Sequence, residues 1–222
     1  MIATVLPAYN EPRERLLASV ASALAVSDLV VVSDDGSREP IEPWYEHPNV
    51  EIVRQSNKGP AAAMNAGVYA ALSLGATRIA RLDVGDTFLP DAKLRQLART
   101  EPALASWHID GVSGNEFRSP KHWRNIIYRD GVFCVCTCVV SADVWRAVGG
   151  FDESLMYGDD WDWTMRVQHA VGWQIHEGAT CVAGAFAGGH TMSAEGDARR
   201  RQLRNACIKE VHRKSRMLRG RV

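Results

Sequence analysis

The sequence predicts an α/β fold in which a mostly parallel, doubly wound sheet lies between two layers of helices. Short apolar β-forming runs alternate with helical patterns through the first half of the chain. A polar or Gly/Pro-rich stretch follows each run, as expected of the loops at the ligand-binding edge of such a sheet. The 222 residues are enough for one substantial domain with its own core. We therefore expect a single α/β domain.

The first half of the chain supplies four expected strands and two expected helices. Runs of β-forming residues predict strands at residues 2–7, 29–37, 50–55 and 78–83. Helical patterns predict helices at 12–26 and 59–75, and Pro12 suits the first turn of the earlier one. Because strands alternate with helices, the strands are expected to pair in parallel.

The second half is less regular and ends in a basic helix. Residues 131–141 form a strongly apolar expected strand, and Ser141 can cap the short helix that follows it. Residues 151–172 are expected to form a loop that leads into a helix, and residues 173–183 a short strand. A helix at residues 199–222 closes the chain. No repeat or low-complexity tract interrupts this order.

Composition indicates a soluble globular protein in a reducing compartment. The chain is 46% hydrophobic and 23% charged, and no run reaches the roughly 18 to 20 apolar residues of a membrane span. The N-terminus has no basic segment before Pro7, unlike a signal peptide. Cys134, Cys136 and Cys138 alternate along an expected strand, which favours small buried side chains over a zinc site. A cytoplasmic location is expected, with peripheral membrane association left open.

The formal net charge is zero, but the charges are unevenly distributed. Residues 199–222 hold ten Lys/Arg and one acid, Glu210, so they carry +9 and the remaining residues carry −9. The basic helix has one narrow apolar stripe, formed by Leu203, Cys207 and Val211. This asymmetry indicates a polyanionic partner. Pairing of the basic helix with the acidic body of the same protein is the alternative.

Polar loops are expected to meet at the carboxyl edge of the sheet, where open α/β folds bind ligands. The loops are residues 7–11, 34–37, 57–60 and 83–86. Two carboxylates, Asp83 and Asp86, follow the fourth strand, and carboxylate oxygens suit a hard cation that is bound to phosphate.

Six segments occur in an order and spacing that resemble the inverting family 2 glycosyltransferases with the GT-A fold. They are PAYNEP, VVVSDDGS, NKGPAAAMNAG, RLDVGD, VGGFDESLMYGDDWDW and GGHTMS. The resemblance implies transfer of a sugar from a nucleotide diphosphate donor, usually a UDP-sugar, to an acceptor hydroxyl. It implies a glycosyltransferase domain at residues 1–198, with a nucleotide-binding half at about 1–90 and an acceptor half at about 91–198, followed by the basic helix at 199–222.

By this resemblance, the loops after the first two strands hold the donor nucleotide. Asp34 and Asp35 are the candidates to accept a hydrogen bond from the base, with Asp35 preferred. Pro7, Tyr9 and Glu11 are expected to line the same pocket, where Tyr9 could pack on the base. An Asx-type turn is the alternative role of the two aspartates.

The segment after the third strand is also expected to bind the donor. Gly59 precedes a helix start, where the backbone can approach a ligand closely and N–H groups can face an anion. Asn57, Lys58 and Asn65 complete this candidate set. Many family members carry an arginine where this chain has Met64, so a charge contact to the donor is missing or supplied from elsewhere, with Lys58 as the substitute.

The acidic loop Asp83-Val84-Gly85-Asp86 departs from the Asp-x-Asp-Asp that the family usually shows. The resemblance assigns Asp83 to the ribose or donor sugar and to the metal, and Asp86 to Mn²⁺ or Mg²⁺. His190 follows at about the distance where the family often brings a histidine to the metal, and imidazole suits Mn²⁺ better than Mg²⁺. Since Gly85 replaces an acid, we expect a metal site with one ligand fewer. An acidic turn and a structural histidine are the alternatives.

The GDDWDW segment is the candidate for the catalytic base. In the family an acidic pair at a helix start has this role and the second acid is the base, which corresponds to Asp160 with Asp159 beside it. Adjacent carboxylates repel, which can raise the pKa of one of them. Their alternative role is to cap the helix and complement its dipole. Trp161 and Trp163 are candidates for an apolar platform at the acceptor, or for the core.

The acceptor is the least determined part of the prediction. Residues 107–130 match no pattern, although His122, Trp123 and Arg124 are candidates to face the acceptor. The basic helix could lie on anionic lipid and bring a lipid-linked glycan or glycolipid to the site. It could instead contact DNA that carries a hydroxymethylated base. Both possibilities stay open at the level of sequence.

Other classes of protein fit less well. A nucleotidyltransferase should show a Gly- and basic-rich loop after its first strand, where this chain has PAYNEPRER. A dinucleotide oxidoreductase needs G-x-G-x-x-G after a strand, and the sequence has none. A nucleotide-sugar or nucleic-acid binding protein that has lost catalysis is the remaining alternative, because Met64 and Gly85 depart from the family pattern.

Overall fold

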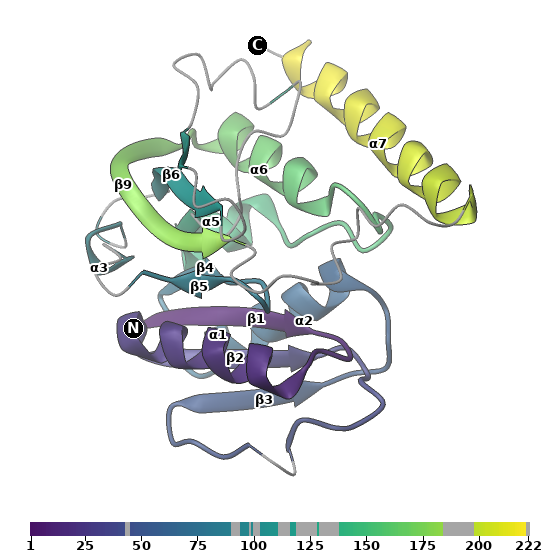
Figure 1. Cartoon of the computed structure of the whole chain (residues 1–222). Coiled ribbons are helices and arrows are strands. Elements are labelled where there is room, and N and C mark those ends of the chain that lie inside the picture. Colours follow the sequence, from purple (N-terminus) through teal and green to yellow (C-terminus); the bar gives the residue numbers. More distant parts are fainter. Residues whose placement is uncertain are drawn as a thin grey trace.

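The computed structural model has the predicted α/β class, and Figure 1 shows how its elements are arranged. It describes residues 1–42, 45–89, 94–97, 99, 103–110, 116–118, 128, 138–183 and 198–220. Within that part the strands form one sheet in the order β3-β2-β1-β4-β8-β6-β9-β5, and β7 pairs with β6.

The first half forms the parallel part of this sheet, as predicted. Its strands are β1 (Ile2–Ala8), β2 (Leu29–Asp34), β3 (Val50–Arg54) and β4 (Arg78–Arg81). These four strands run parallel to one another, and Val5 of β1 pairs with Val31 on one side and with Arg81 on the other. β1 and β2 are buried almost throughout, as is typical of strands covered on both faces. The carboxyl ends of the four strands therefore lie along one edge.

Two helices cover opposite faces of the parallel strands. They are α1 (Arg13–Val26) and α2 (Pro60–Ser73). Successive side chains of a strand point to opposite faces, so β1 contributes to two separate cores. Val5 belongs to the core that contains Val68 of α2, and Leu6 to the core that contains Val20 of α1.

The second half extends the sheet beyond β4. The added strands are β5 (Thr87–Phe88), β6 (Ala103–Asp110), β7 (Glu116–Arg118), β8 (Cys138–Ser141) and β9 (Gln174–Ala183). β8 runs antiparallel to both β4 and β6, whereas β9 runs parallel to β6. β5 and β7 pair antiparallel with β9 and β6. A single turn of helix, α3 (Leu94–Leu97), lies between β5 and β6 along the chain.

The sequence predicted only part of this extension. β8 and β9 lie within predicted strands, whereas β5, β6 and β7 were not predicted. Residues 131–137 of the predicted strand, with Cys134 and Cys136, lie outside the described residues. Cys138 is buried, as the interpretation of a small buried side chain requires.

Two helices flank the loop that leads to the GDDWDW segment. α5 (Ala142–Val148) begins at Ser141, whose hydroxyl accepts a hydrogen bond from the Val144 N–H at 3.1 Å, so the predicted cap is present. α6 (Asp159–Ala170) begins after Gly158. The aromatic rings of Trp145, Phe151 and Trp163 pack together between these helices and the sheet.

The basic helix α7 (Ala198–Arg219) lies beside α6, at the upper right of Figure 1. Cys207 and Val211 of its apolar stripe are buried, whereas Leu203 is exposed. Gly158 packs closely against α7, because a Cβ there would lie 3.2 Å from Ile208 Cδ1 and 3.3 Å from Val211 Cγ2. Among the described residues, no helix has the length and apolar character needed to cross a membrane.

Candidate active site

The predicted loops and the predicted base segment meet at the carboxyl edge of the parallel strands. Arg81 is the last residue of β4, and Asp159 is the first residue of α6. Their side chains approach to 3.9 Å, measured from Arg81 Nη1 to Asp159 Oδ2. The edge of the sheet and the start of α6 therefore form one site.

Asp34 is fully buried and holds the turn after β2. Its Oδ1 accepts a hydrogen bond from the Ser37 N–H at 2.8 Å, and its Oδ2 pairs with Arg54 at the end of β3. Arg54 also donates to the Ser37 carbonyl at 2.7 Å. Both oxygens of Asp34 are thus used inside the protein, which corresponds to the Asx-type turn rather than to a contact with a base.

Asp35 is also buried, and its carboxylate organises the loop before α2. Oδ1 accepts hydrogen bonds from Gln55 Nε2 at 2.7 Å and from the Lys58 N–H at 2.9 Å, and Oδ2 accepts one from the Gly59 N–H at 2.8 Å. The Gly59 N–H expected to face an anion is therefore engaged by Asp35. The side chains of Asn57 and Lys58 are exposed beside this loop. The contact of Asp35 with a base stays a prediction.

The loop after β1 lies against the Asp34 turn. The Asn10 N–H donates to Ser37 Oγ at 2.9 Å, which joins the two loops. Tyr9 is 47% exposed, so a ligand could pack on its ring, while Pro7 and Glu11 are partly buried. The three residues predicted to line the nucleotide pocket thus lie at the expected edge.

The acidic loop after β4 is a tight turn closed by a hydrogen bond from the Asp86 N–H to the Asp83 carbonyl at 2.9 Å. Gly85 within it has φ of +104°, and a Cβ there would lie 3.1 Å from Arg15 Cδ of α1. A side chain at this position would be strained whatever its charge. Backbone geometry therefore explains the glycine where the family usually has an acid.

The acidic pair lies in the first turn of α6. The N-cap residue is Gly158, and no side chain caps this end, so the aspartates complement the helix dipole without capping it. Asp159 is only 6% exposed. Asp160 is less buried, and its Oδ1 accepts a hydrogen bond from the Trp161 N–H at 2.7 Å. Of the two carboxylates, Asp160 is the one that a ligand can reach more easily.

Arg81 joins the acidic loop to this acidic pair. It was not predicted as a site residue from the sequence. Its Nε donates to Asp83 Oδ1 at 2.7 Å, while its Nη1 faces Asp159. Burial acts to lower the pKa of Arg81, but Asp83, Asp159 and Asp160 raise it overall, so the guanidinium stays charged. The signal in the sequence was a second arginine at the end of a short strand, directly before an acidic loop.

The pKa of Asp159 is raised to about 6. Burial is the largest cause, and the neighbouring carboxylates Asp160 and Asp83 raise it further, whereas the charge of Arg81 acts to lower it. The predicted repulsion within the acidic pair thus falls on Asp159. The more exposed Asp160 remains the candidate to touch an acceptor.

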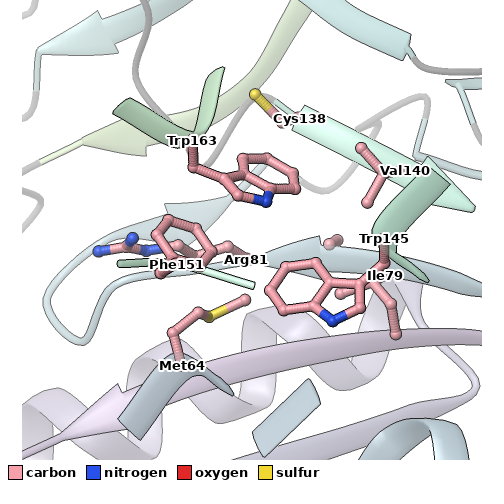
Figure 2. Close-up of a pocket in the computed structure, with 9 residues that line it drawn as sticks. Met64, Ile79, Arg81, Cys138, Val140, Trp145, Phe151 and Trp163 are labelled. Carbon is pink, nitrogen blue, oxygen red and sulfur yellow. The ribbon is translucent and has the colours of Figure 1, made fainter. Parts of the chain in front are cut away.

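Behind the acids lies a small, largely apolar cavity, and Figure 2 shows the residues that line it. Trp163 is buried there, stacks on Phe151 with ring centroids 5.0 Å apart, and donates its Nε1–H to the Gly149 carbonyl at 3.1 Å. Met64 lines the same cavity. The Trp163 ring thus packs in the core, which is the alternative role that the sequence left open for it.

Asn65 likewise has a structural role. Its Oδ1 accepts from the Phe151 N–H at 2.8 Å, and its Nδ2 donates to the Phe151 carbonyl at 3.0 Å and to Glu153 Oε1 at 2.8 Å. This buried amide fastens α2 to the loop before α6. Its hydrogen-bonding groups are engaged inside the protein, and its contact with a donor stays a prediction.

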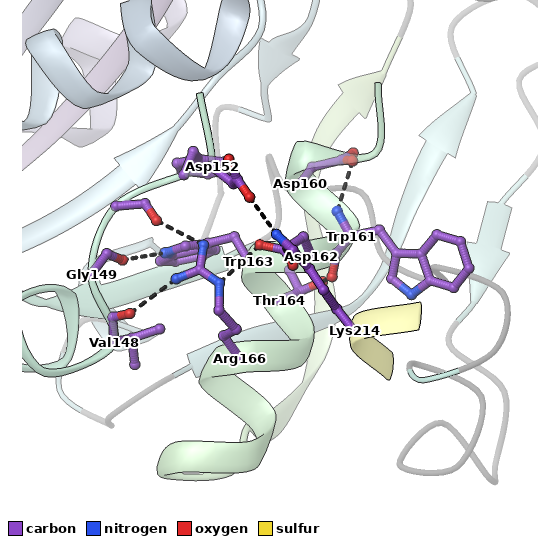
Figure 3. A network of polar contacts seen from close by, with 12 residues as sticks. Val148, Gly149, Asp152, Asp160, Trp161, Asp162, Trp163, Thr164, Arg166 and Lys214 are labelled. Carbon is purple, nitrogen blue, oxygen red and sulfur yellow. Dashed lines mark hydrogen bonds and ion pairs between the residues drawn. The ribbon is translucent and has the colours of Figure 1, made fainter. Parts of the chain in front are cut away.

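A polar network holds α6 to the preceding loop and to α7 (Figure 3). Lys214 of α7 pairs with Asp152 and lies 3.2 Å from Asp162. Although burial acts to raise the pKa of Asp152, its hydrogen bonds with Lys214 and Ser154 lower it to about 2. Arg166 donates to Asp162 Oδ2 at 2.9 Å and to two carbonyls of that loop. The helix that carries the candidate base is thus fixed from both sides.

Trp161 follows Asp160 directly and turns toward α7. Its ring meets the imidazole of His212 edge to face, with centroids 5.0 Å apart. Trp161 is partly exposed, so it remains a candidate for the acceptor platform. His122, Trp123 and Arg124, the other acceptor candidates, lie outside the described residues.

The structure describes two of the three predicted metal ligands. Asp83 and Asp86 supply oxygen ligands of the kind that Mg²⁺ and Mn²⁺ accept. His190 lies outside the described residues. Within the part of the chain that the structure describes, no group of three His, Cys, Asp or Glu side chains could hold a metal ion. The metal site therefore stays a prediction.

Comparison with known proteins places the chain in a family. A sequence profile of glycosyl transferase family 2 matches residues 4–155, which is more than half of the chain. Chondroitin synthase of Escherichia coli is 28% identical over 185 residues, and the match covers 75% of this chain and 26% of that protein. The chain thus spans about a quarter of the length of this relative.

Solved structures of S. aureus TarS have a similar fold. The complex of TarS 1–349 with UDP-GlcNAc superposes with a TM-score of 0.70 at 18% identity, over 96% of this chain and 66% of that one. The complex of TarS 1–349 with UDP superposes with a TM-score of 0.63, over 93% and 70% of the two chains. At this level of identity the likeness concerns the fold.

Proposed function

This chain belongs to glycosyl transferase family 2 and has the GT-A fold, and we propose that it transfers a sugar from a nucleotide diphosphate donor to an acceptor hydroxyl with inversion of the anomeric configuration. The observation that carries the proposal is the meeting of two acidic segments around one arginine. Asp83 after β4 and Asp159 at the start of α6 both face Arg81, at the edge where open α/β sheets bind ligands.

The donor is proposed to be a UDP-sugar that lies along the ends of β1, β2 and β4. Tyr9 is exposed at this edge, and Asp35 holds the adjoining loop through three hydrogen bonds. Asp83, whose side chain is 46% exposed, is proposed to contact a ribose or sugar hydroxyl. Structures of similar fold carry UDP and UDP-GlcNAc, which supports this class of donor.

The reaction is proposed as a single displacement. The acceptor oxygen attacks the anomeric carbon, the bond from that carbon to the diphosphate oxygen breaks, and the nucleoside diphosphate leaves with the electron pair. Asp160 takes the proton from the acceptor hydroxyl, as a general base within hydrogen-bond reach can do. Asp160 is favoured over Asp159 because Asp159 is buried against Arg81. One displacement inverts the configuration of the anomeric carbon.

A divalent cation, Mn²⁺ or Mg²⁺, is proposed to bind with the donor. Asp86 and Asp83 would hold it together with His190, and when bound it would supply positive charge for the leaving diphosphate. Asp83 Oδ1 accepts a hydrogen bond from Arg81 Nε at 2.7 Å, so Arg81 orients one of the proposed metal ligands.

The acceptor is proposed to be polyanionic and to approach along α7. Cys207 and Val211 are buried, so these two residues of the apolar stripe are not available for insertion into lipid. Its exposed face carries Lys209, Arg213 and Arg216. DNA with a hydroxymethylated base and an anionic lipid-linked glycan both have the charge that this face would attract.

The experiment that tests the proposal is the shift of the unfolding temperature with UDP, GDP, CDP and dTDP, each with Mn²⁺, with Mg²⁺ and with EDTA. We expect one diphosphate, UDP, to stabilise the protein, and Mn²⁺ to increase its effect. An Asp35→Ala variant should lose the shift. Asp28→Asn, at the opposite end of β2, is the matched control and should keep the shift, because the Asp28 carboxylate pairs with Arg95 and accepts from the Ile2 N–H, away from the proposed pocket.

The outcomes separate the parts of the proposal. A UDP shift that EDTA leaves unchanged would contradict the metal while supporting the donor pocket. Failure of all four diphosphates to stabilise the protein would contradict the proposed transfer. Equal losses in Asp35→Ala and Asp28→Asn would contradict the location of the pocket.

A further inference from the structure

Arg81 is a charged residue in a position where packing alone would favour an apolar one. It ends β4 beside Phe151, with the guanidinium carbon 5.4 Å from the ring centroid, and its side chain is 10% exposed. Figure 2 shows it next to Met64 and Phe151 at the margin of the apolar cavity. Burying a guanidinium costs free energy unless its donors are satisfied, and an apolar side chain of similar volume is often at least as stable there.

One donor of this guanidinium is left unsatisfied. Nε is used by Asp83, but in the described part of the chain Nη1 has no hydrogen-bond partner. Asp159 Oδ2 is also buried and has none, and the two atoms face each other at 3.9 Å. This separation is about 1 Å longer than that of a charge-assisted hydrogen bond. An unmade bond between two buried opposite charges indicates an arrangement that can still tighten.

We propose that Arg81 is a positioning residue that couples donor binding to the placement of the catalytic base. When a donor engages Asp83, the guanidinium is released toward Asp159, the 3.9 Å gap closes to a hydrogen bond, and the first turn of α6 is fixed with Asp160 toward the acceptor. Asp83 is 46% exposed and can turn to a ligand, whereas the buried Asp159 cannot. This inference rests on the proposed transfer reaction and adds an order to it, donor before acceptor.

Arg166 shows how a purely structural arginine differs in the same helix. Its Nε donates to Asp162, Nη1 donates to the Val148 carbonyl at 2.9 Å, and Nη2 donates to the Gly150 carbonyl at 2.7 Å. All three nitrogens are satisfied within the protein. Arg166 is therefore the matched control for Arg81, because each pairs with an aspartate of the first turn of α6.

The test combines kinetics with a double-mutant cycle. Arg81→Met, Arg81→Lys, Asp159→Asn and the Arg81→Met/Asp159→Asn double variant are compared in their dissociation constant for UDP and in kcat and KM for a UDP-sugar. We expect UDP affinity to stay within about threefold of wild type, while kcat falls about 10- to 100-fold in Arg81→Met and less in Arg81→Lys. The double variant should be no slower than Arg81→Met, because both changes break one interaction. Arg166→Met should lower the unfolding temperature and leave kcat within about threefold.

Two results would overturn the inference. The first is a kcat for Arg81→Met that stays as close to wild type as that of Arg166→Met. The second is a double variant whose kcat falls by the product of the factors by which Arg81→Met and Asp159→Asn each lower it. The same double-mutant cycle is measured by thermal unfolding, with and without UDP. The coupling between Arg81 and Asp159 should be larger when UDP is bound. If wild type turns over no donor, the proposed function fails, and this unfolding cycle alone decides for or against the coupling of Arg81 and Asp159.

Discussion

The carboxylates of the site share one chemistry but differ in their surroundings, and this difference separates their roles. Asp34 and Asp35 are buried acceptors whose hydrogen bonds shape two loops. Asp159 is buried beside Arg81 and near other acids, whereas Asp160 is more open. A buried carboxylate with a raised pKa costs folding free energy whenever it is ionised.

Replacing Asp159 by asparagine should therefore stabilise the protein more at neutral pH than at acid pH. Because the folded pKa is about 6 and the ordinary value is 3.8, the native state binds more protons than the unfolded state between these values. The free energy of unfolding of the wild type falls as pH rises through this window. In Asp159→Asn this fall is absent, so its advantage over wild type should grow by up to about 3 kcal/mol between about pH 4 and pH 7.5.

Urea unfolding of both proteins at the two pH values measures this difference. Asp28→Asn is the control with the opposite sign, because a backbone hydrogen bond from Ile2 lowers the pKa of Asp28. Its disadvantage relative to wild type should be larger at neutral pH. An advantage of Asp159→Asn that does not change with pH would contradict the buried, ionised state of Asp159.

Individual residues were only partly predictable from the sequence. Asp159 and Asp160 could be located because an acidic pair before a helix is visible in sequence. Trp163 and Asn65 could not be assigned, since an aromatic ring or an amide reads alike whether it faces a ligand or the core. Arg81 was missed because its role depends on α6, which lies far along the chain and meets β4 only in the fold.

At the scale of elements, the candidate base depends on how α6 packs on α7. Gly158 precedes α6 with φ of +74°, and a Cβ there would lie 3.2 Å from Ile208 Cδ1 and 3.3 Å from Val211 Cγ2. Lys214 adds a charged contact between α7 and Asp152. α7 therefore supports the turn that presents Asp160.

Gly158→Ala should lower the free energy of unfolding by more than the strain of a left-handed backbone conformation alone would. Gly172 at the end of α6 provides the matched control, because its φ is +75° and a Cβ there would meet only Gln168 Nε2, at 3.9 Å. Each variant should lose about 1 kcal/mol from the left-handed conformation. Gly158→Ala should lose about 1 to 3 kcal/mol more from overpacking against α7. Equal losses in chemical denaturation would show that the contact with α7 adds nothing.

Elements with strong periodicity were predicted well, and those without it were not. The four parallel strands and the helices α1, α2 and α6 follow from apolar runs and helical patterns that local sequence determines. β5 has two residues and β7 has three, which is too short for a pattern. β6 reads ALASWHID, without the alternation of a half-buried strand, so its place in the sheet depends on pairing with β8 and β9.

At the scale of the whole molecule, a balanced charge conceals an acidic body and a basic helix. The structure accounts for part of this asymmetry, because Lys214 of α7 pairs with Asp152 and Asp162 of the acidic body. The remaining exposed positions of α7, including Lys209 and Arg216, face outward. They are available to a polyanion that reaches the site along α7.

The Lys209→Gln/Arg216→Gln variant should therefore bind anionic polymers more weakly than wild type. The probes are a DNA duplex of about 20 base pairs and vesicles with and without phosphatidylserine, each titrated at about 50 and 200 mM salt. Wild type should bind at least one of these probes, and more weakly at higher salt. For the variant, the slope of the logarithm of the binding constant against the logarithm of the salt concentration should be smaller in magnitude by about 1 to 2. DNA binding without vesicle binding would favour a nucleic-acid acceptor, and the reverse a lipid-linked one.

The control carries the same loss of charge on exposed arginines outside α7, Arg99→Gln/Arg146→Gln. It should bind the probes as wild type does. A control as weak as the α7 variant would mean that net charge rather than α7 attracts the polymer, and absence of binding to either probe at low salt would contradict the proposed acceptor face.

The central claim is that the acids around Arg81 transfer a sugar with Asp160 as the base. The most direct measurement follows UDP release from a panel of UDP-sugars by wild type and by Asp160→Asn, with UDP binding measured on both proteins. We expect Asp160→Asn to bind UDP like wild type and to release UDP from the sugar donor about 100- to 10,000-fold more slowly. Equal release by the two proteins, or loss of UDP binding in Asp160→Asn, would contradict the claim.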